Sequence, residues 1–220
     1  MKREAALKLK RLIDAVGAAA GLTVLSPLLA GAAVAVWTSM GRPIFFRHER
    51  PGYKGRLFTM WKFRTMRPTG DGEVWFRHDE ERLTRVGRFL RRTSIDELPQ
   101  LWSVLRGDMS LVGPRPLLAE YLPNYTAEQR RRHDMKPGLT GWAQVNGRRA
   151  ISFSRRLAHD VWYVDHFSLG LDARILARTV REVFRSAGMV PGQSLEDVDD
   201  LGLAPGDGGR GTGSREERAR

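Results

Sequence analysis

The 220-residue chain contains no cysteine, and this absence excludes several kinds of chemistry at once. Disulfide bonds, thiol nucleophiles and cysteine-ligated metal centres all require a residue that the sequence does not have. The absence also fits a reducing compartment without requiring one. We find no internal repeat. The length instead suits one domain of ordinary size with appendages.

Acidic residues are few relative to basic ones. Asp and Glu together number 25 against 37 Lys and Arg, so the formal net charge is +12 at pH 7. A positive excess of this size implies an acidic partner, which could be a nucleic acid, an anionic lipid surface or a phosphorylated substrate. The hydrophobic fraction of 41% is enough for a folded core. The positions of the basic residues must therefore decide among the three partners.

One long stretch near the N-terminus is almost without charge. Residues 12–37 read LIDAVGAAAGLTVLSPLLAGAAVAVW, with Asp14 as the only charged residue. As a straight helix this stretch would rise about 39 Å, whereas the hydrocarbon core of a bilayer is roughly 30 Å thick. Ser26 and Pro27 interrupt it near the middle, where the proline removes a backbone hydrogen bond and predicts a sharp bend.

Basic clusters flank this stretch on both sides. Lysines and arginines near membrane segments prefer the cytoplasmic side, so a spanning helix would place one cluster on the unfavourable side. A re-entrant segment, which enters and leaves through the same face, keeps both clusters inside, and Ser26 or water can bond the backbone groups freed near Pro27. We expect the re-entrant form. A true span, and a signal peptide cleaved near the A-x-A pattern at residues 33–35, remain alternatives.

The next segment, residues 42–66, is typical of an extended hairpin. Apolar residues lead into a turn rich in proline and glycine at residues 51–55, and the stretch RLFTMWKFRTM follows. Alternate residues of a strand share a face, so Lys62 and Arg64 would point the same way, with aromatic residues on the other side. Two cations on one face can form a phosphate clamp, or they can simply face solvent.

The stretch RRTSIDELPQL, residues 91–101, sets two adjacent carboxylates, Asp96 and Glu97, behind paired arginines. One interpretation is a helix start, because residues 94–97 fit the capping box S-x-x-E. If Asp96 is the cap instead, Pro99 falls in the first helical turn, where proline is tolerated. The second placement keeps the Asp96 carboxylate ionised at a helix N-terminus, which also attracts phosphate. That arrangement suits a nucleophile that meets a phosphorylated substrate.

Two further segments have the composition of phosphate-binding loops. In RGDMSLVGPRP, Pro114 and Pro116 fix the backbone on both sides of Arg115, whose planar guanidinium matches phosphate geometry. In KPGLTGWAQVNGR, residues 136–148, glycines lie between polar and basic residues, so backbone amides can approach a ligand closely. Each pattern taken alone is also compatible with an ordinary rigid turn.

Helical spacing of apolar residues predicts an amphipathic helix over residues 79–92 and a last helix over residues 171–187. The last helix carries a stripe of arginines, which indicates either a solvated face or a helix lying on anionic lipid. From residue 188 onward the chain is rich in Gly, Asp and Glu and lacks aromatic residues, as is typical of a disordered tail.

These motifs together resemble the small monotopic phosphoglycosyl transferases, bacterial sugar transferases that start glycan assembly on a polyprenyl phosphate. The resemblance covers roughly residues 8–187 and runs in the family's order: KRLID, the Ser-Pro break, KFRTM, TSIDELPQL, GDMSLVGPRP and PGLTGWAQVNGR. It implies an α+β fold, in which a re-entrant N-terminal membrane helix precedes a mostly helical cytoplasmic catalytic domain with a short β-hairpin and interfacial amphipathic helices. The expected parts are a membrane anchor at 1–40, the catalytic domain at 41–187 and a tail at 188–220.

The resemblance also implies a reaction. In the family, the aspartate of an Asp-Glu dyad, here Asp96 beside Glu97, attacks the β-phosphate of a UDP-sugar, releases UMP and holds the sugar phosphate covalently. Polyprenyl (undecaprenyl) phosphate then takes the sugar phosphate in a ping-pong scheme. Mg²⁺ bound by Asp96 and Glu97 offsets the diphosphate charge. The sequence departs from the family at Ile95, where leucine is usual, and at Trp142 in the glycine loop.

The resemblance and the residue patterns together give the expected substrate-binding set: Lys62, Arg64, Arg91, Pro114, Arg115, Pro116, Gly141, Gln144, Asn146 and Arg148. The expected partners are the UDP-sugar, polyprenyl phosphate and membrane lipid at the cytoplasmic face of the inner membrane; a nucleic acid is not expected, and an oligomer is allowed. Two other functions stay open at this point, namely a membrane-tethered module that binds polyanions and a Mg²⁺-dependent diphosphatase with water as acceptor. The identity of the sugar is not readable.

Overall fold

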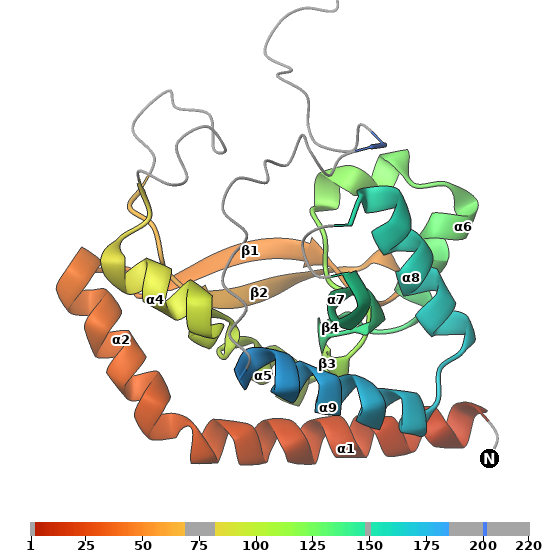
Figure 1. Ribbon diagram of the computed structural model, residues 1–220, viewed down its shortest axis with the longest axis horizontal. Helices are drawn as coiled ribbons and strands as arrows, with labels where there is room; N and C mark the ends of the chain where they lie inside the picture. The colour runs from red at the N-terminus through yellow and green to blue at the C-terminus, as the bar shows by residue number, and fades with distance from the viewer. Residues whose placement is uncertain (1–2, 69–81, 148–150, 185–199, 202–220) are drawn as a thin grey trace, which may run out of the picture.

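The computed structural model describes residues 3–68, 82–147, 151–184 and 200–201 (Figure 1). Two helices open the chain, α1 over Arg3–Val24 and α2 over Ser26–Met40, and they are bent by 62° at the break between them. Within the described residues no single helix is long and apolar enough to cross a membrane, whereas α1 and α2 taken together meet that criterion by length and composition.

The break between α1 and α2 lies at the predicted Ser-Pro pair. Pro27 falls in the first turn of α2, where a missing N–H costs no helical hydrogen bond. The Ser26 hydroxyl donates to the Thr23 carbonyl at 2.8 Å, so a carbonyl freed by the break is bonded inside the chain. The predicted bend is therefore confirmed. A re-entrant path through a membrane stays a prediction.

Helix α1 packs two alanines and two charged residues against the rest of the protein and exposes several of its large apolar residues. On the exposed side, Leu12, Ile13 and Val16 are 59%, 45% and 61% exposed. A surface helix of a protein in water shows the opposite arrangement. The buried positions recur at every fourth residue: Ala6, Lys10, Asp14 and Ala18.

The expected β-hairpin is confirmed. Strands β1 (Phe45–Pro51) and β2 (Leu57–Phe63) pair antiparallel. The short 3-10 turn η1 (Tyr53–Gly55) joins them, and Lys54 adopts a left-handed backbone conformation there, with φ 55°. The proline- and glycine-rich stretch therefore reverses the chain, as its composition predicts.

The rest of the described chain is mostly helical, which confirms the α+β class. Strands β3 and β4 pair in parallel and form a second two-stranded sheet. The remaining elements in chain order are α4 (Arg85–Thr93), η2 (Ile95–Glu97), α5 (Gln100–Arg106), β3 (Ser110–Val112), η3 (Ala119–Asn124), α6 (Ala127–Arg130), η4 (Arg131–Asp134), β4 (Gly138–Thr140), α7 (Trp142–Gly147), α8 (Phe153–Asp165) and α9 (Leu169–Phe184).

The two predicted amphipathic helices correspond to α4 and α9. Helix α4 covers the second half of the predicted range, and residues 79–81 lie outside the described residues. Helix α9 begins two residues earlier than predicted, and residues 185–187 lie outside the described residues. The predicted tail also lies outside them, apart from residues 200–201.

Apolar clusters fix both halves of the bent helix pair to the domain. Against α1, Ala18 packs with Leu101 and Val104 of α5. Against α2, Val36 packs with Leu90 of α4, in a cluster that also includes residues of the hairpin. Ile95 of η2 packs against the same cluster, so α2 lies close to the turn that carries the Asp-Glu dyad.

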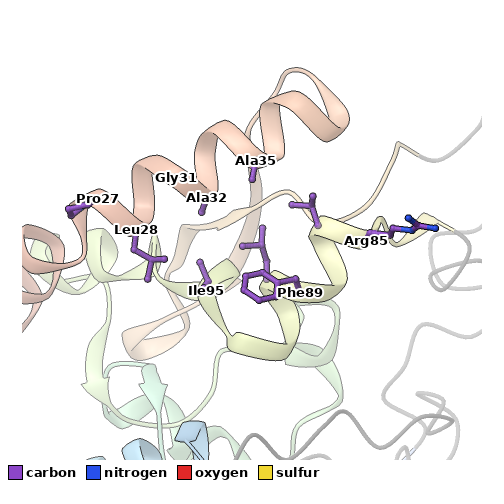
Figure 2. Close-up of a pocket in the computed structure, with 10 residues that line it drawn as sticks. Pro27, Leu28, Gly31, Ala32, Ala35, Arg85, Phe89 and Ile95 are labelled. Atoms are coloured by element: carbon purple, nitrogen blue, oxygen red, sulfur yellow. The ribbon is translucent and has the colours of Figure 1, made fainter.

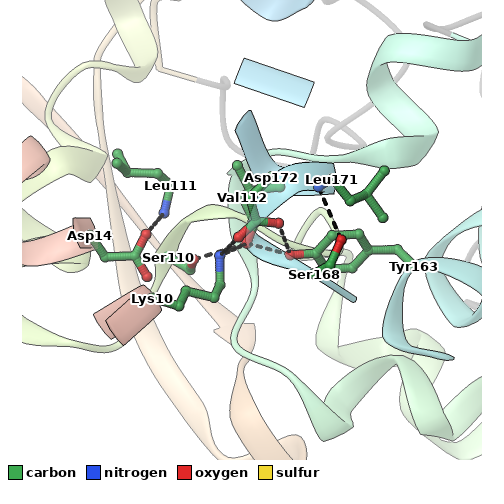
Figure 3. Close-up of polar contacts among 9 residues, drawn as sticks. All are labelled: Lys10, Asp14, Ser110, Leu111, Val112, Tyr163, Ser168, Leu171 and Asp172. Atoms are coloured by element: carbon green, nitrogen blue, oxygen red, sulfur yellow. Dashed lines mark hydrogen bonds and ion pairs between the residues drawn. The ribbon is translucent and has the colours of Figure 1, made fainter. Parts of the chain in front are cut away.

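A buried polar cluster ties α1 to α8 and α9 (Figure 3). The Lys10 ammonium donates to Asp172 at 2.6 Å and to the Val112 carbonyl at 2.9 Å, and the Tyr163 hydroxyl donates to Asp172 at 2.6 Å. Burial raises the pKa of Asp172, while Lys10 and Tyr163 act in the opposite direction. One turn further along α1, Asp14 accepts the Leu111 N–H at 3.0 Å. Strand β3, which leads into the Pro114–Pro116 loop, is thus held from α1.

Candidate active site

The Asp-Glu dyad lies on η2, a single 3-10 turn between α4 and α5. Ser94 has a left-handed conformation, with φ 58°, and turns the chain out of α4. Helix α5 begins only at Gln100, with Pro99 as its N-cap, and no side chain caps either η2 or α5. Both capping predictions are therefore wrong, because Asp96 lies inside its own 3-10 turn and not at the start of α5.

Two cations contact Glu97. Its Oε1 atom accepts from Lys62 Nζ at 2.6 Å and from Arg115 Nη2 at 2.6 Å, and Arg115 Nη1 lies 3.4 Å from Oε2. Burial alone would raise the pKa of Glu97, but the charges of Arg115 and Lys62 outweigh burial and hold that pKa far below its ordinary value. Glu97 is therefore ionised at every physiological pH, and it orients the Arg115 fork.

Asp96 has the opposite environment. Its residue is 7% exposed, and no hydrogen bond to its carboxylate comes from the described part of the chain. Burial, followed by the neighbouring Glu97 charge, raises the pKa of Asp96, while Lys62, Arg91 and Arg115 act against the rise. Adjacent carboxylates whose pKa values are driven apart are typical of sites where the two groups have different roles.

The loop that carries Arg115 is held from both sides. Pro114 and Pro116 are buried, as expected for a stiff turn. The Arg132 guanidinium donates to the Arg115 carbonyl at 2.6 Å and also pairs with the buried Asp160 at 2.6 Å. The position of Arg115 is therefore fixed by a second, fully buried ion pair behind it.

The glycines of the two loop segments serve mainly to bring their backbones together. A Cβ atom on Gly138 would lie 2.0 Å from the Gly113 nitrogen, and one on Gly141 would lie 2.1 Å from the Gly113 carbonyl oxygen. Such contacts are impossible for any side chain. The glycine pattern predicted a ligand loop. The structure shows that these glycines allow residues 136–141 to pack directly against the loop of Arg115.

The structure brings together Lys62, Glu97 and Arg115, with Arg91 close enough to influence Asp96. It does not bring Arg64 to them. The buried Arg64 side chain donates to the Met40 carbonyl and, at 2.9 Å, to the Gly41 carbonyl at the end of α2. The predicted clamp of Lys62 and Arg64 is therefore not formed. The last carbonyls of a helix have no partners within the helix, and Arg64 donates hydrogen bonds to those at the end of α2.

Two of the remaining predicted residues, Gln144 and Asn146, lie on α7. Asn146 is exposed, and its side chain bonds the Trp142 carbonyl at 2.8 Å and Arg178 at 3.1 Å. The Gln144 amide has buried atoms without a hydrogen-bond partner among the described residues, which leaves it available to a ligand. Arg148 lies outside the described residues.

Two arginines near Arg115 were missed by the sequence reasoning. Burial, together with the Arg115 charge, lowers the pKa of Arg50 to about 10, and the same two causes lower the pKa of Arg156. The Arg50 Nε atom is buried without a hydrogen-bond partner among the described residues. Arginines that repel one another around the fixed Arg115 guanidinium are suited to bind a polyanion, which would neutralise their charge. No local pattern distinguishes these two from solvated arginines.

The dyad also fits a magnesium ion. Mg²⁺ is usually held by one or two carboxylates, with waters and substrate phosphates completing its coordination. Asp96 and Glu97 provide two such carboxylates, and no group of three or more potential metal ligands occurs among the described residues, at the dyad or away from it. Because two cations already occupy Glu97, Asp96 is the more available donor.

A carboxylate dyad surrounded by arginines, beside an apolar bent helix pair, defines an enzyme that handles phosphorylated substrates. Its family is identified by comparison with known proteins. The sequence model of the bacterial sugar transferase family matches residues 5–186, and the chain belongs to that family.

Three relatives illustrate the similarity. The chain is 52% identical over 181 residues to the uncharacterized sugar transferase EpsL of Bacillus subtilis, covering 82% of this chain and 90% of that protein. It is 43% identical to a UDP-glucose:undecaprenyl-phosphate glucose-1-phosphate transferase of Xanthomonas campestris pv. campestris, covering 79% of this chain and 38% of that protein. It is 40% identical to a UDP-galactose-lipid carrier transferase of Erwinia amylovora, covering 82% of this chain and 41% of that protein. The chain thus spans most of the first relative and less than half of the other two.

Proposed function

We propose that this enzyme transfers a sugar 1-phosphate from a UDP-sugar to polyprenyl phosphate, giving polyprenyl diphosphate-sugar and UMP. Relatives in Xanthomonas, Caulobacter and Escherichia carry the name UDP-glucose:undecaprenyl-phosphate glucose-1-phosphate transferase, which supports this reaction. The observation that carries the proposal is the contrast within the dyad. Glu97 is bonded to two cations, while the Asp96 carboxylate, beside it, has no hydrogen bond from the described residues.

In the first step an Asp96 carboxylate oxygen attacks the β-phosphorus of the UDP-sugar. The bond from that phosphorus to the bridging oxygen breaks, UMP leaves with the electron pair, and an aspartyl phosphosugar remains. In the second step an oxygen of polyprenyl phosphate attacks the same phosphorus and releases the Asp96 carboxylate. A ping-pong sequence of this kind avoids binding two polyanions at once, whose repulsion in a partly desolvated site would be severe.

The cations have distinct roles in this scheme. Arg115, held by Glu97, contributes positive charge beside the reacting phosphate, and Arg50 and Arg156 offset the charge of the diphosphate. Lys62 keeps Glu97 ionised and adds positive charge beside Asp96. Mg²⁺, held by Asp96 and Glu97, would supply further neutralisation of the diphosphate.

We also propose that α1 and α2 form a re-entrant anchor in the inner membrane, with the catalytic domain on the cytoplasmic face. The 62° bend and the exposed apolar residues of α1 support this topology, as do the basic residues that flank the helix pair. One enzyme fixed in one leaflet can then present Asp96 both to a soluble nucleotide and to a lipid phosphate at the interface.

The test is capture of the intermediate. Purified protein in detergent micelles is mixed with UDP-glucose or UDP-galactose carrying a labelled β-phosphate, quenched, digested and analysed by mass spectrometry. We expect a phosphosugar on Asp96, its disappearance on addition of undecaprenyl phosphate, and no adduct in Asp96→Asn. Ser94→Ala, at an exposed position of the same turn, serves as the control and should retain the adduct.

Two outcomes would contradict the scheme. Turnover with undecaprenyl phosphate but without any adduct in the wild-type protein would exclude the covalent step. UMP release over many turnovers that neither needs nor is changed by undecaprenyl phosphate would instead identify a diphosphatase. Because the relatives named above act on different sugars, a screen of UDP-sugars scored by UMP release is needed to identify the donor.

A further inference from the structure

An apolar groove lies between α2 and α4, on the side of α2 that faces the domain (Figure 2). Its volume is about 510 Å³, and Arg85 is the one charged residue among those that line it in the described chain. Gly31 and Ala35 from α2, Phe89 from α4 and Ile95 from η2 contribute to its walls.

Small residues on α2 create this space. Figure 2 shows Gly31, Ala32 and Ala35 along the side of α2 that faces α4. A Cβ atom added at Gly31 would meet no other atom within 4 Å. Phe89, on the opposite wall, is 60% exposed. An open groove with apolar walls on both sides is typical of a site that binds an apolar ligand.

The groove extends to the turn that carries the dyad, although Asp96 and Glu97 themselves do not line it. Ile95 points into it from below, and the next residue in the chain is Asp96 (Figure 2). At one end of the groove lies Pro27, at the break between α1 and α2. An apolar chain in this groove would therefore have its head beside Asp96 and would lie against the helices proposed as the membrane anchor.

We propose that the groove binds the isoprenoid chain of the polyprenyl phosphate acceptor, in the part nearest to its phosphate. This inference rests on the proposed function, and it adds the residues that select a lipid acceptor over water or a soluble phosphate. A UDP-sugar has no hydrocarbon chain and therefore cannot make apolar contacts along the groove. A long flexible isoprenoid can, because its methyl branches fit between the small residues of α2.

The first experiment measures occupancy without relying on turnover. Since the chain has no cysteine, Gly31→Cys and Ala30→Cys each introduce a single thiol, the first in the groove and the second at an exposed position that does not line it. Each variant in detergent micelles is treated with N-ethylmaleimide, with undecaprenyl phosphate or with an ordinary phospholipid at the same concentration. We expect undecaprenyl phosphate to slow labelling of Gly31→Cys about tenfold and to leave Ala30→Cys unchanged.

The second experiment measures the consequence for transfer. Gly31→Phe fills the groove, and Ala30→Phe adds the same bulk to α2 outside it. We expect Gly31→Phe to raise the KM for undecaprenyl phosphate roughly tenfold or more. The rate of UMP release in a single turnover with donor alone should not change. Ala30→Phe should behave as the wild-type protein. A geranyl phosphate acceptor, too short to need the whole groove, should be affected less than undecaprenyl phosphate.

The results separate this inference from the proposed function. Equal protection of both cysteines, or equal protection by phospholipid, would overturn the groove assignment, even if sugar phosphate transfer proceeds normally. Unchanged kinetics in Gly31→Phe would overturn it as well. If the wild-type protein releases no UMP from any donor, the proposed function fails, and the labelling experiment still decides whether the groove holds an isoprenoid.

Discussion

Two charge clusters in this protein, one buried and one partly buried, look alike in composition but differ in whether every charged group has a partner. In the cluster of Lys10, Asp172 and Tyr163, one ammonium meets one carboxylate at 2.6 Å, and a hydroxyl and a backbone carbonyl complete the set. In the cluster of Lys62, Glu97 and Arg115, two cations share one carboxylate, and a second carboxylate lies beside it.

The difference separates structure from function. Every charged group of the Lys10 cluster has its partners, so the cluster's contribution is to hold α1, β3 and α9 together. The Glu97 cluster has surplus positive charge and a neighbouring carboxylate, Asp96, whose pKa is raised. Charged groups that lack a full set of partners in a partly buried site are available to bind or react with a substrate. The following predictions test this division.

The largest expected effect is that of Asp96→Asn on catalysis. Removal of the nucleophile should lower sugar phosphate transfer by on the order of 10³-fold or more. The free energy of unfolding should not fall, because the substitution removes a buried carboxylate that Glu97 repels. Transfer is followed as UMP release, and unfolding by denaturant titration in detergent. If the variant transfers sugar phosphate normally, or if it fails to fold, Asp96 is not the proposed nucleophile and belongs with the groups that hold the fold.

Lys10→Met should have the reverse profile. It leaves Asp172 buried without its cation, which we expect to cost about 3–5 kcal/mol of unfolding free energy. The matched control is Lys8→Met on the same helix, where the ion pair with Glu4 is about four-fifths exposed and its loss should change stability little. Equal stability of the two variants would show that the Lys10 cluster does not hold α1 in place.

Glu97→Gln should shift the pH dependence of the first step. Asp96 attacks in its ionised form, and burial together with Glu97 raises its pKa, so the rate falls on the acidic side. Without the Glu97 charge the pKa of Asp96 falls, and the acidic limb should move to lower pH while the maximal rate decreases. Single-turnover UMP release across pH measures both changes. A limb that stays in place or moves to higher pH would show that Glu97 does not control Asp96.

The smallest expected effect is that of Tyr163→Phe. The substitution removes the hydroxyl that donates to Asp172 at 2.6 Å and should cost about 1–2 kcal/mol of unfolding free energy. Transfer should change less than about twofold, because Lys10 still holds the carboxylate. Tyr53→Phe, at a half-exposed position in the hairpin turn, is the control for loss of a hydroxyl. A large loss of transfer with little loss of stability would place Tyr163 among the catalytic groups.

Much of the fold could be predicted because it depends on local rules. Pro27 sets the bend between α1 and α2, and the turn at residues 51–55 sets the hairpin. The assignment of Asp96, Glu97 and Arg115 to one site came from the family resemblance, because no local pattern relates residues 18 positions apart. The caps were mispredicted because two overlapping patterns competed at residues 94–99, and the chain formed a separate 3-10 turn instead.

The remaining features depend on contacts between distant parts of the chain. Lys10 and Asp172 are 162 residues apart, and no local pattern relates them. Arg64 was assigned to the phosphate because strand alternation gives a face but not the neighbour on that face, which is the end of α2. The groove beside Gly31 likewise exists only after α2 and α4 have packed.

The backbone contact among Gly113, Gly138 and Gly141 has a practical consequence for engineering. Each of these glycines lies too close to the other segment for any side chain, so the two loops behave as one preassembled part. A chimera that exchanges residues 107–116 without residues 136–141 would separate the two backbones and displace Arg115. Grafts intended to alter donor choice should therefore transplant both segments from the same parent, or leave both untouched.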